Sequence, residues 1–131
     1  MFDRENIQDL YRLSPTQEGI LFHYLNDPGS QAYFDQTCFH LTGKVSEIDL
    51  EKAYQMLVSK YDVLRTVFLH KKMTKPLQVV MKKRKACLQV ENLRGLSPEE
   101  QEQRLEEIKR EDRERGFDLS RDLLFRLTLV Q

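Results

Sequence analysis

Residues 60–68 have the sequence KYDVLRTVF, in which Arg65 stands among the apolar residues Val63, Leu64, Val67 and Phe68. A guanidinium at Arg65, between Leu64 and Thr66, is costly to bury unless a carboxylate or several carbonyl oxygens accept its N–H groups. Its neighbours are typical of a buried strand, so we expect Arg65 to be buried beside a partner. The alternative is that Arg65 lies on the solvent side of its strand.

The clearest helix of the chain comes directly before this stretch, over residues 46–61. Ser46 is a suitable N-cap, and apolar residues recur at intervals of three and four, at Leu50, Ala53, Tyr54, Leu57, Val58 and Tyr61. We expect one broad apolar stripe that packs on a sheet with strands near 33–41 and 123–130. The residues expected to pack are Leu50, Tyr54, Leu57 and Val58.

Two further helices are predicted by capping boxes. Ser14 and Gln17 flank Pro15 at the start of a helix that continues to about Leu25. Residues 97–100, SPEE, open another helix, which Gly116 ends by taking a left-handed conformation.

The last of these helices is rich in charge, with only Leu105 and Ile108 available for apolar contact. Pairs four residues apart predict an exposed helix face; they are Glu100 with Arg104 and Glu106 with Arg110.

Alternation and β-branched residues predict strands between the helices. The expected strands are 32–41, 63–69, 76–81, 87–90 and 123–130. In the last of them, Phe125, Leu127 and Leu129 are expected to face inward and Arg126 outward. Helices and strands mix without a strict βαβ alternation, which favours an α+β fold built as a two-layer α/β sandwich.

Bulk composition excludes several classes of protein. The 131 residues fit a single folding unit, and the formal net charge of zero argues against nonspecific binding of nucleic acid. No apolar run approaches the roughly 20 residues of a membrane span, and the first residues carry no secretory signal. We therefore expect a cytoplasmic protein without a membrane partner. Cys38 and Cys87 are expected to be buried thiols outside any disulfide or metal site.

The sequence contains no residue that we expect to be catalytic. His23, His40 and His70 lack a companion at a useful spacing, and the chain has no zinc-binding histidine pair, nucleophile elbow or glycine-rich phosphate loop. A basic cluster flanks an expected hairpin and consists of Lys71, Lys72, Lys75, Lys82, Lys83, Arg84 and Lys85. We expect it to keep a strand edge soluble, the alternative being a patch for an acidic or phosphorylated partner.

Two segments, in the right order, together resemble the condensation domains of nonribosomal peptide synthetases. Residues 60–68 resemble the family's RHExLRTxF motif, with lysine, tyrosine and aspartate in its first three places. Residues 13–23, LSPTQEGILFH, resemble the opening helix, often written SPMQEGMLFH. The resemblance runs from Leu10 to Ser120.

This resemblance implies that residues 13–131 form part of the amino-terminal lobe of a fold related to chloramphenicol acetyltransferase. In the family, two lobes form a V, and a later HHxxxDG loop carries the catalytic histidine. That loop is absent from this sequence, which is therefore expected to lack catalytic activity by itself. Arg65 would pair with the loop's aspartate and brace it. The parent would form peptide bonds between carrier-bound aminoacyl and peptidyl thioesters tethered to phosphopantetheine, with no cofactor bound by this chain.

Residues 17–23 resemble the condensation domains that accept a D-configured upstream residue. Such domains often begin with a docking segment, here residues 1–12, which would receive the terminus of an upstream synthetase that ends in an epimerisation domain. Its amphipathic acidic surface would consist of Phe2, Asp3, Glu5, Ile7, Asp9 and Leu10. A frayed lead-in to the domain is the alternative.

Two other functions stay open at this point. The chain could be a non-catalytic binding module for a synthetase terminus or a carrier protein, or the lobe of an epimerisation or heterocyclisation domain. Without the rest of the parent domain, we also expect exposed apolar surface and self-association.

Overall fold

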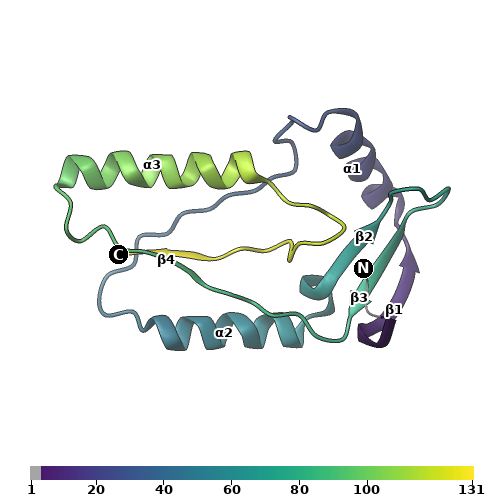
Figure 1. The fold of residues 1–131 in the computed structure, drawn as a ribbon, viewed down its shortest axis with the longest axis horizontal. Helices are drawn as coiled ribbons and strands as arrows, with labels where there is room; N and C mark the ends of the chain where they lie inside the picture. The colour runs from purple at the N-terminus through teal and green to yellow at the C-terminus, as the bar shows by residue number, and fades with distance from the viewer. Residues whose placement is uncertain (1–3) are drawn as a thin grey trace.

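The computed structural model describes residues 4–131 and contains three α-helices, two 3₁₀ turns and five strands within that range (Figure 1). The helices and turns are η1 (Arg4–Asn6), α1 (Pro15–Asn26), α2 (Glu47–Lys60), η2 (Asp62–Arg65) and α3 (Pro98–Arg115). The strands are β1 (Ile7–Arg12), β2 (Thr66–Leu69), β3 (Leu77–Met81), β4 (Gln89–Glu91) and β5 (Thr128–Val130).

Both predicted capping boxes form. The Ser14 hydroxyl accepts from the Gln17 N–H at 3.2 Å, and the Gln17 side chain accepts from the Ser14 N–H at 2.8 Å. Ser97 and Glu100 repeat the arrangement at the start of α3. These reciprocal bonds satisfy N–H groups that a helix start leaves without partners. Gly116 ends α3 with a φ of 55°, as predicted.

A three-stranded antiparallel sheet in the order β1-β3-β2 stands at one end of the molecule (Figure 1). Its core consists of Val67, Val79 and Met81, with Ile7 and Leu69 packed against them. The strand predicted over 63–69 is shorter than expected, because Asp62–Arg65 forms a 3₁₀ turn.

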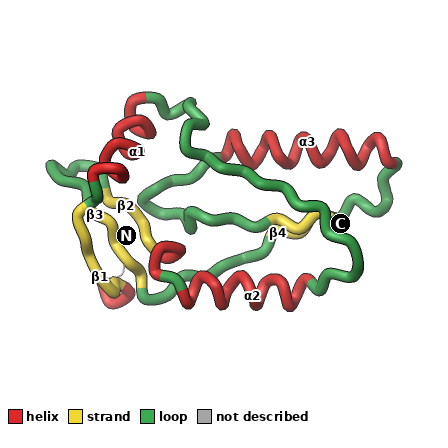
Figure 2. Tube along the Cα trace, turned by 180° about the vertical axis from the view of Figure 1, so that it is seen from behind, coloured by secondary structure: helices red, strands yellow, loops and turns green. Residues whose placement is uncertain are grey.

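A second sheet pairs β4 and β5 in parallel, and α2 and α3 lie on opposite sides of this pair (Figures 1 and 2). Tyr54 and Val58 of α2 form a core with Ala86, against which Leu123 and Leu127 pack. The predicted contact between α2 and the last segment is thus confirmed, although the strand there covers only Thr128–Val130. The combination of helices with two separate sheets confirms the predicted α+β class.

The strand predicted over residues 32–41 is wrong. These residues run as an extended segment from α1 towards α2 and pair with no strand of the described chain (Figure 2). Phe39 is 78% exposed. The segment has strand-like composition, but a strand also requires a neighbour for its backbone hydrogen bonds.

The apolar stripe of α2 is narrower than predicted. Tyr54 and Val58 are buried and Leu50 is half-buried, whereas Leu57 is 45% exposed and Ala53 is also exposed. The core contacts follow a spacing of four residues, so the flanking apolar positions turn towards solvent. Leu57 is therefore not a core residue of this structure.

Cys38 and Cys87 are both exposed, so the prediction of buried thiols is wrong. Each lies outside the two core clusters, on a segment without regular structure.

Helix α3 is exposed and crossed by ion pairs, as predicted, but the predicted pairs are not the ones that form. Arg104 instead contacts Glu107 and Glu111, and Arg110 lies 3.8 Å from Glu114. No helix within residues 4–131 is long and apolar enough to cross a membrane.

Candidate functional site

Arg65 is only 6% exposed, so its predicted burial is confirmed and the solvent-side alternative is wrong. Its Nη2 forms an ion pair with Asp62. Nε donates to the Val58 carbonyl at 3.2 Å, and Nη1 donates to the Met81 carbonyl at 3.3 Å. The guanidinium therefore joins η2 to the end of α2 and the end of β3.

These contacts explain how an apolar segment holds a charge. Val58 lies in the last turn of α2, where carbonyl oxygens lack intrahelical donors and the helix dipole favours a cation. Asp62 is held in turn, because the Thr66 hydroxyl donates to its carbonyl at 2.8 Å. A guanidinium has two N–H bonds on each terminal nitrogen, so both Nη atoms of Arg65 keep a donor for a further acceptor.

A groove of about 780 Å³ lies between α1, the extended segment, α3 and the chain that leads into β5. Its lining is largely apolar and includes Ile20, Phe34, Phe68, Leu105, Phe117 and Leu127. The rings of Phe34 and Phe117 lie 5.5 Å apart, which joins the extended segment to the turn after α3.

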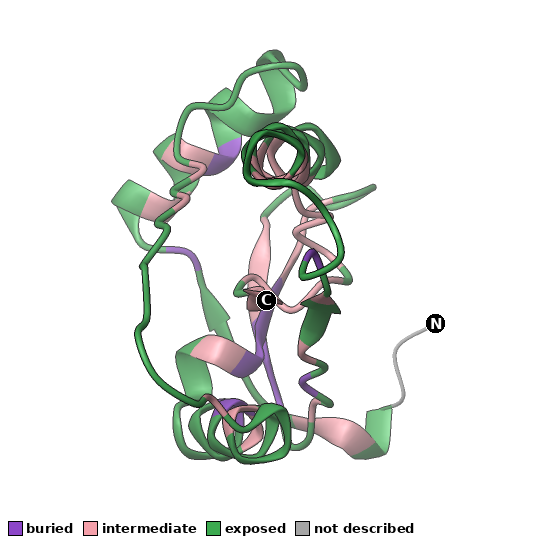
Figure 3. Ribbon diagram, turned by 90° about the vertical axis from the view of Figure 1, so that its left-hand side faces the viewer, coloured by how far each residue is buried: buried purple, intermediate pink, exposed green. Residues whose placement is uncertain are grey.

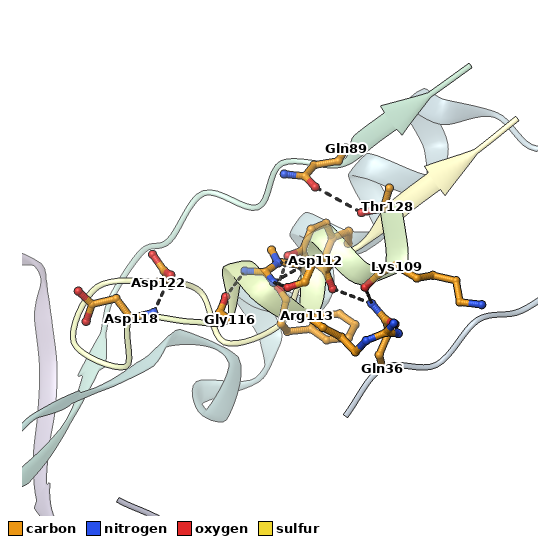
Figure 4. A network of polar contacts seen from close by, with 12 residues as sticks. Gln36, Gln89, Lys109, Asp112, Arg113, Gly116, Asp118, Asp122 and Thr128 are labelled. Atoms are coloured by element: carbon orange, nitrogen blue, oxygen red, sulfur yellow. Dashed lines mark hydrogen bonds and ion pairs between the residues drawn. The ribbon is translucent and has the colours of Figure 1, made fainter. Parts of the chain in front are cut away.

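A polar network borders this groove and connects three segments (Figure 4). Arg126 donates through Nε to Asp112 Oδ1 at 2.9 Å and through Nη2 to the Asp112 carbonyl at 3.0 Å. Gln36, from the extended segment, donates to Asp112 Oδ2 at 3.1 Å and accepts from Arg113 at 2.6 Å. One carboxylate thus holds both the extended segment and the approach to β5.

This network was not predicted from the sequence. The expected alternation put Arg126 on the solvent side, whereas the Arg126 side chain is 13% exposed and the neighbouring Phe125 is 38% exposed. The alternation rule does not apply here, because β5 begins only at Thr128. The signal that could have found Arg126 is the one used for Arg65: a guanidinium between two apolar residues needs buried acceptors.

The three histidines are not brought together. His23 and His40 are exposed, while His70 lies with Nδ1 3.1 Å from the Phe68 carbonyl and its ring against Tyr24. Within residues 4–131 no group of three or more metal-ligating side chains is assembled.

Of the predicted docking residues, Glu5 lies in η1 and Ile7, Asp9 and Leu10 lie in β1. Phe2 and Asp3 fall outside the described residues. Ile7 packs against the sheet core, while Leu10 is 49% exposed. The hydrogen bond from the Tyr11 hydroxyl, and then that from the Leu10 N–H, lower the pKa of Asp9. Residues 7–12 are thus a strand of the lobe's own sheet, with an acidic group on its exposed side.

Residues of the basic cluster contact different parts of the chain. Lys71 lies 3.7 Å from Asp118, and Lys82 donates to the Glu5 carbonyl at 2.8 Å. Arg84 donates to the Arg121 carbonyl at 2.6 Å, and burial lowers its pKa.

Solved structures share this arrangement of elements. The condensation domain of the monacolin K polyketide synthase MokA matches 96% of the chain with a TM-score of 0.68 at 20% identity, and the chain covers 28% of that structure. The cyclization-docking bidomain of EpoB from Sorangium cellulosum matches 66% of the chain with a TM-score of 0.57 at 28% identity, over 17% of that structure. The fold is therefore that of a condensation-type domain.

Sequence comparison gives the family. The model of the family described as "Condensation domain" matches residues 7–131, and the chain belongs to that family. It is 44% identical over 99% of its length to gramicidin S synthase 2 of Brevibacillus brevis. It is also 40% identical over 99% of its length to surfactin synthase subunit 3 of Bacillus subtilis (strain 168).

The chain spans only a small part of these relatives. It covers 3% of the gramicidin S synthase and 10% of the surfactin synthase subunit. The resemblance seen in the two sequence motifs is confirmed, and it extends over nearly the whole chain.

Proposed function

We propose that this chain is the amino-terminal part of a condensation domain that forms peptide bonds on a nonribosomal peptide synthetase. The observation that carries the proposal is the 44% identity to gramicidin S synthase 2 over 99% of the chain. The donor would be a peptidyl thioester and the acceptor an aminoacyl thioester, each tethered to a phosphopantetheine arm of a carrier protein. The amine nitrogen attacks the thioester carbonyl, a C–N bond forms and the C–S bond breaks. The amine loses a proton and the departing sulfur leaves as a thiol.

In this reaction the chain serves as a scaffold, in which Arg65 holds the catalytic loop. Both terminal nitrogens of Arg65 keep a donor after the contacts with Met81 and Asp62. These donors would hold the aspartate of an HHxxxDG loop supplied by the parent domain. A carboxylate held in this way keeps the loop's shape while the loop histidine acts on the substrates.

The partners follow from the same proposal. Carrier proteins would present the two thioesters in the cytoplasm. Residues 1–12 would receive the terminus of an upstream synthetase that ends in an epimerisation domain. Asp9 and Leu10 support this role, because both are exposed on β1 and supply an acidic and an apolar side chain.

The experiment uses the chain extended through both lobes of the parent domain, together with loaded donor and acceptor carriers. Mass spectrometry of the acceptor carrier should show the mass of the condensed peptidyl product. The matched control is the same reaction with an acceptor carrier that lacks the phosphopantetheine arm. Transfer of the donor to water alone, with no amide product, would contradict the proposal and would indicate a hydrolase.

A further inference from the structure

The guanidinium of Arg126, which lies just before β5, contacts several groups at the end of α3. Besides its two bonds to Asp112, it donates from Nη1 to the Gly116 carbonyl at 2.5 Å. Its guanidinium carbon also lies 4.1 Å from the centre of the Phe117 ring. All of these partners belong to the last turn of α3 and the residues directly after it.

Helix ends explain why an arginine suits this place. The last four carbonyl oxygens of a helix have no intrahelical donor, and the negative end of the helix dipole favours a cation. The planar fork of arginine can bond a carbonyl and a carboxylate while it stacks on an aromatic ring, whereas lysine supplies only a point charge. The contacts of Arg126 therefore fix both its position and its direction.

The network extends from Arg126 to the opposite wall of the groove. Asp112 accepts from Arg126 at Oδ1 and from Gln36 at Oδ2, and Gln36 also donates to the Lys109 carbonyl at 3.0 Å. Asp112, Arg126 and Gln36 all line the groove. The Asp112 carboxylate thus contacts both Arg126 and the opposite wall of the groove.

We propose that Arg126 is a positioning residue for the condensation reaction. It is attached to the end of α3 and lies two residues before β5 (Thr128–Val130), so it fixes the approach of the chain to β5. This inference rests on the proposed function, in which the catalytic loop follows on from this part of the lobe. A misplacement of about 1 Å far from the chemistry can cost about 100-fold in rate.

The test uses the chain extended through both lobes, with carrier-bound donor and acceptor. Arg126→Gln should lower kcat by about tenfold to 100-fold, while KM for the acceptor carrier changes by less than about twofold. Arg126→Lys keeps the charge beside Asp112 but lacks the fork, so its kcat should lie between those of the wild type and Arg126→Gln. Arg110→Gln is the matched control, because Arg110 is an exposed residue of α3 and its ion pair within residues 4–131 is with Glu114.

The folded fraction of each variant is measured by circular dichroism, and kcat is expressed per folded molecule. A kcat of Arg126→Gln equal to that of the wild type would overturn the inference, as would a loss explained entirely by the unfolded fraction. If Arg126→Gln does not fold, the same comparison is made with Arg126→Lys, for which an unchanged kcat is the contrary result. An inactive wild type would contradict the proposed function and this inference together, whereas an active wild type with an equally active variant contradicts the inference alone.

Discussion

Arg65 and Arg126 are both arginines with little exposed surface and the same kinds of partner. Each is a guanidinium in an apolar surrounding, and each bonds a carbonyl in the last turn of a helix, at Val58 of α2 and Asp112 of α3. Each also has a carboxylate partner, Asp62 or Asp112. Helix C-termini supply acceptors, and bonds to them offset the desolvation cost of the buried charge.

Replacing Arg65 by alanine in the 131-residue chain should lower its free energy of unfolding. The change leaves the Val58 and Met81 carbonyls without the donor that Arg65 supplies, at a cost of about 1 to 3 kcal/mol for each. Urea unfolding measures the loss. Arg94→Ala is the control, since Arg94 is exposed and should change stability by less than about 0.5 kcal/mol. Equal stability of the two variants would show that Arg65 is not needed in its buried place.

The carboxylate of Asp118 gives the stability a dependence on pH. The hydroxyl and then the backbone N–H of Ser120 lower the pKa of Asp118 below its ordinary value of 3.8. A carboxyl with a lowered pKa stabilises the fold above the unfolded pKa, and that stability is lost as the pH falls through the folded pKa. Ser120→Ala should therefore flatten the fall in urea midpoint as the pH is lowered below about 4. An unchanged profile would contradict this role of Asp118.

At the scale of elements, the sequence predicted what depends on neighbours along the chain. Both capping boxes and the end of α3 at Gly116 are local, and all three formed as expected. The strand predicted over 32–41 did not form, because a strand also needs a partner that residues 4–131 do not supply. The network around Arg126 was missed for a related reason: it includes the contact between Gln36 and Asp112, which are 76 residues apart in the sequence.

Two adjacent residues of α2 test the width of its buried face. Val58 is fully buried and Leu57 is 45% exposed. Val58→Ala removes two methyl groups from the core and should cost about 2 kcal/mol, whereas Leu57→Ala should cost less than about 1 kcal/mol. Urea unfolding measures the free energy of unfolding of both variants. A larger loss for Leu57→Ala would mean that the broad stripe predicted from the sequence is the correct one.

At the scale of the whole molecule, the lobe leaves much apolar surface uncovered. The large exposed side chains include Phe22, Tyr33, Phe39, Leu41, Ile48 and Met56. The exposed residues lie on α1, on α2 and on the extended segment that lacks a strand partner (Figure 3). Surface of this kind is typical of an interface with another part of a protein.

The 131-residue chain should therefore associate with itself in solution. Sedimentation at several concentrations should show dimers or larger species, because apolar surface and an unpaired strand edge both favour association. Phe39→Ser, at a residue that is 78% exposed, should weaken the association without unfolding the chain. A monomer at every concentration, with no binding of a hydrophobic dye, would contradict this expectation.

The most direct test concerns Arg65 within the chain extended through both lobes. The measurement is the rate of peptide bond formation between loaded carriers, made for the 131-residue chain, the extended chain and the extended chain with Arg65→Ala. We predict product from the extended chain alone, since Arg65→Ala would leave the loop aspartate unpaired and remove both activity and about 3 to 5 kcal/mol of stability. Full activity of Arg65→Ala, or turnover by the 131-residue chain, would contradict the account of this chain as a scaffold that braces a catalytic loop.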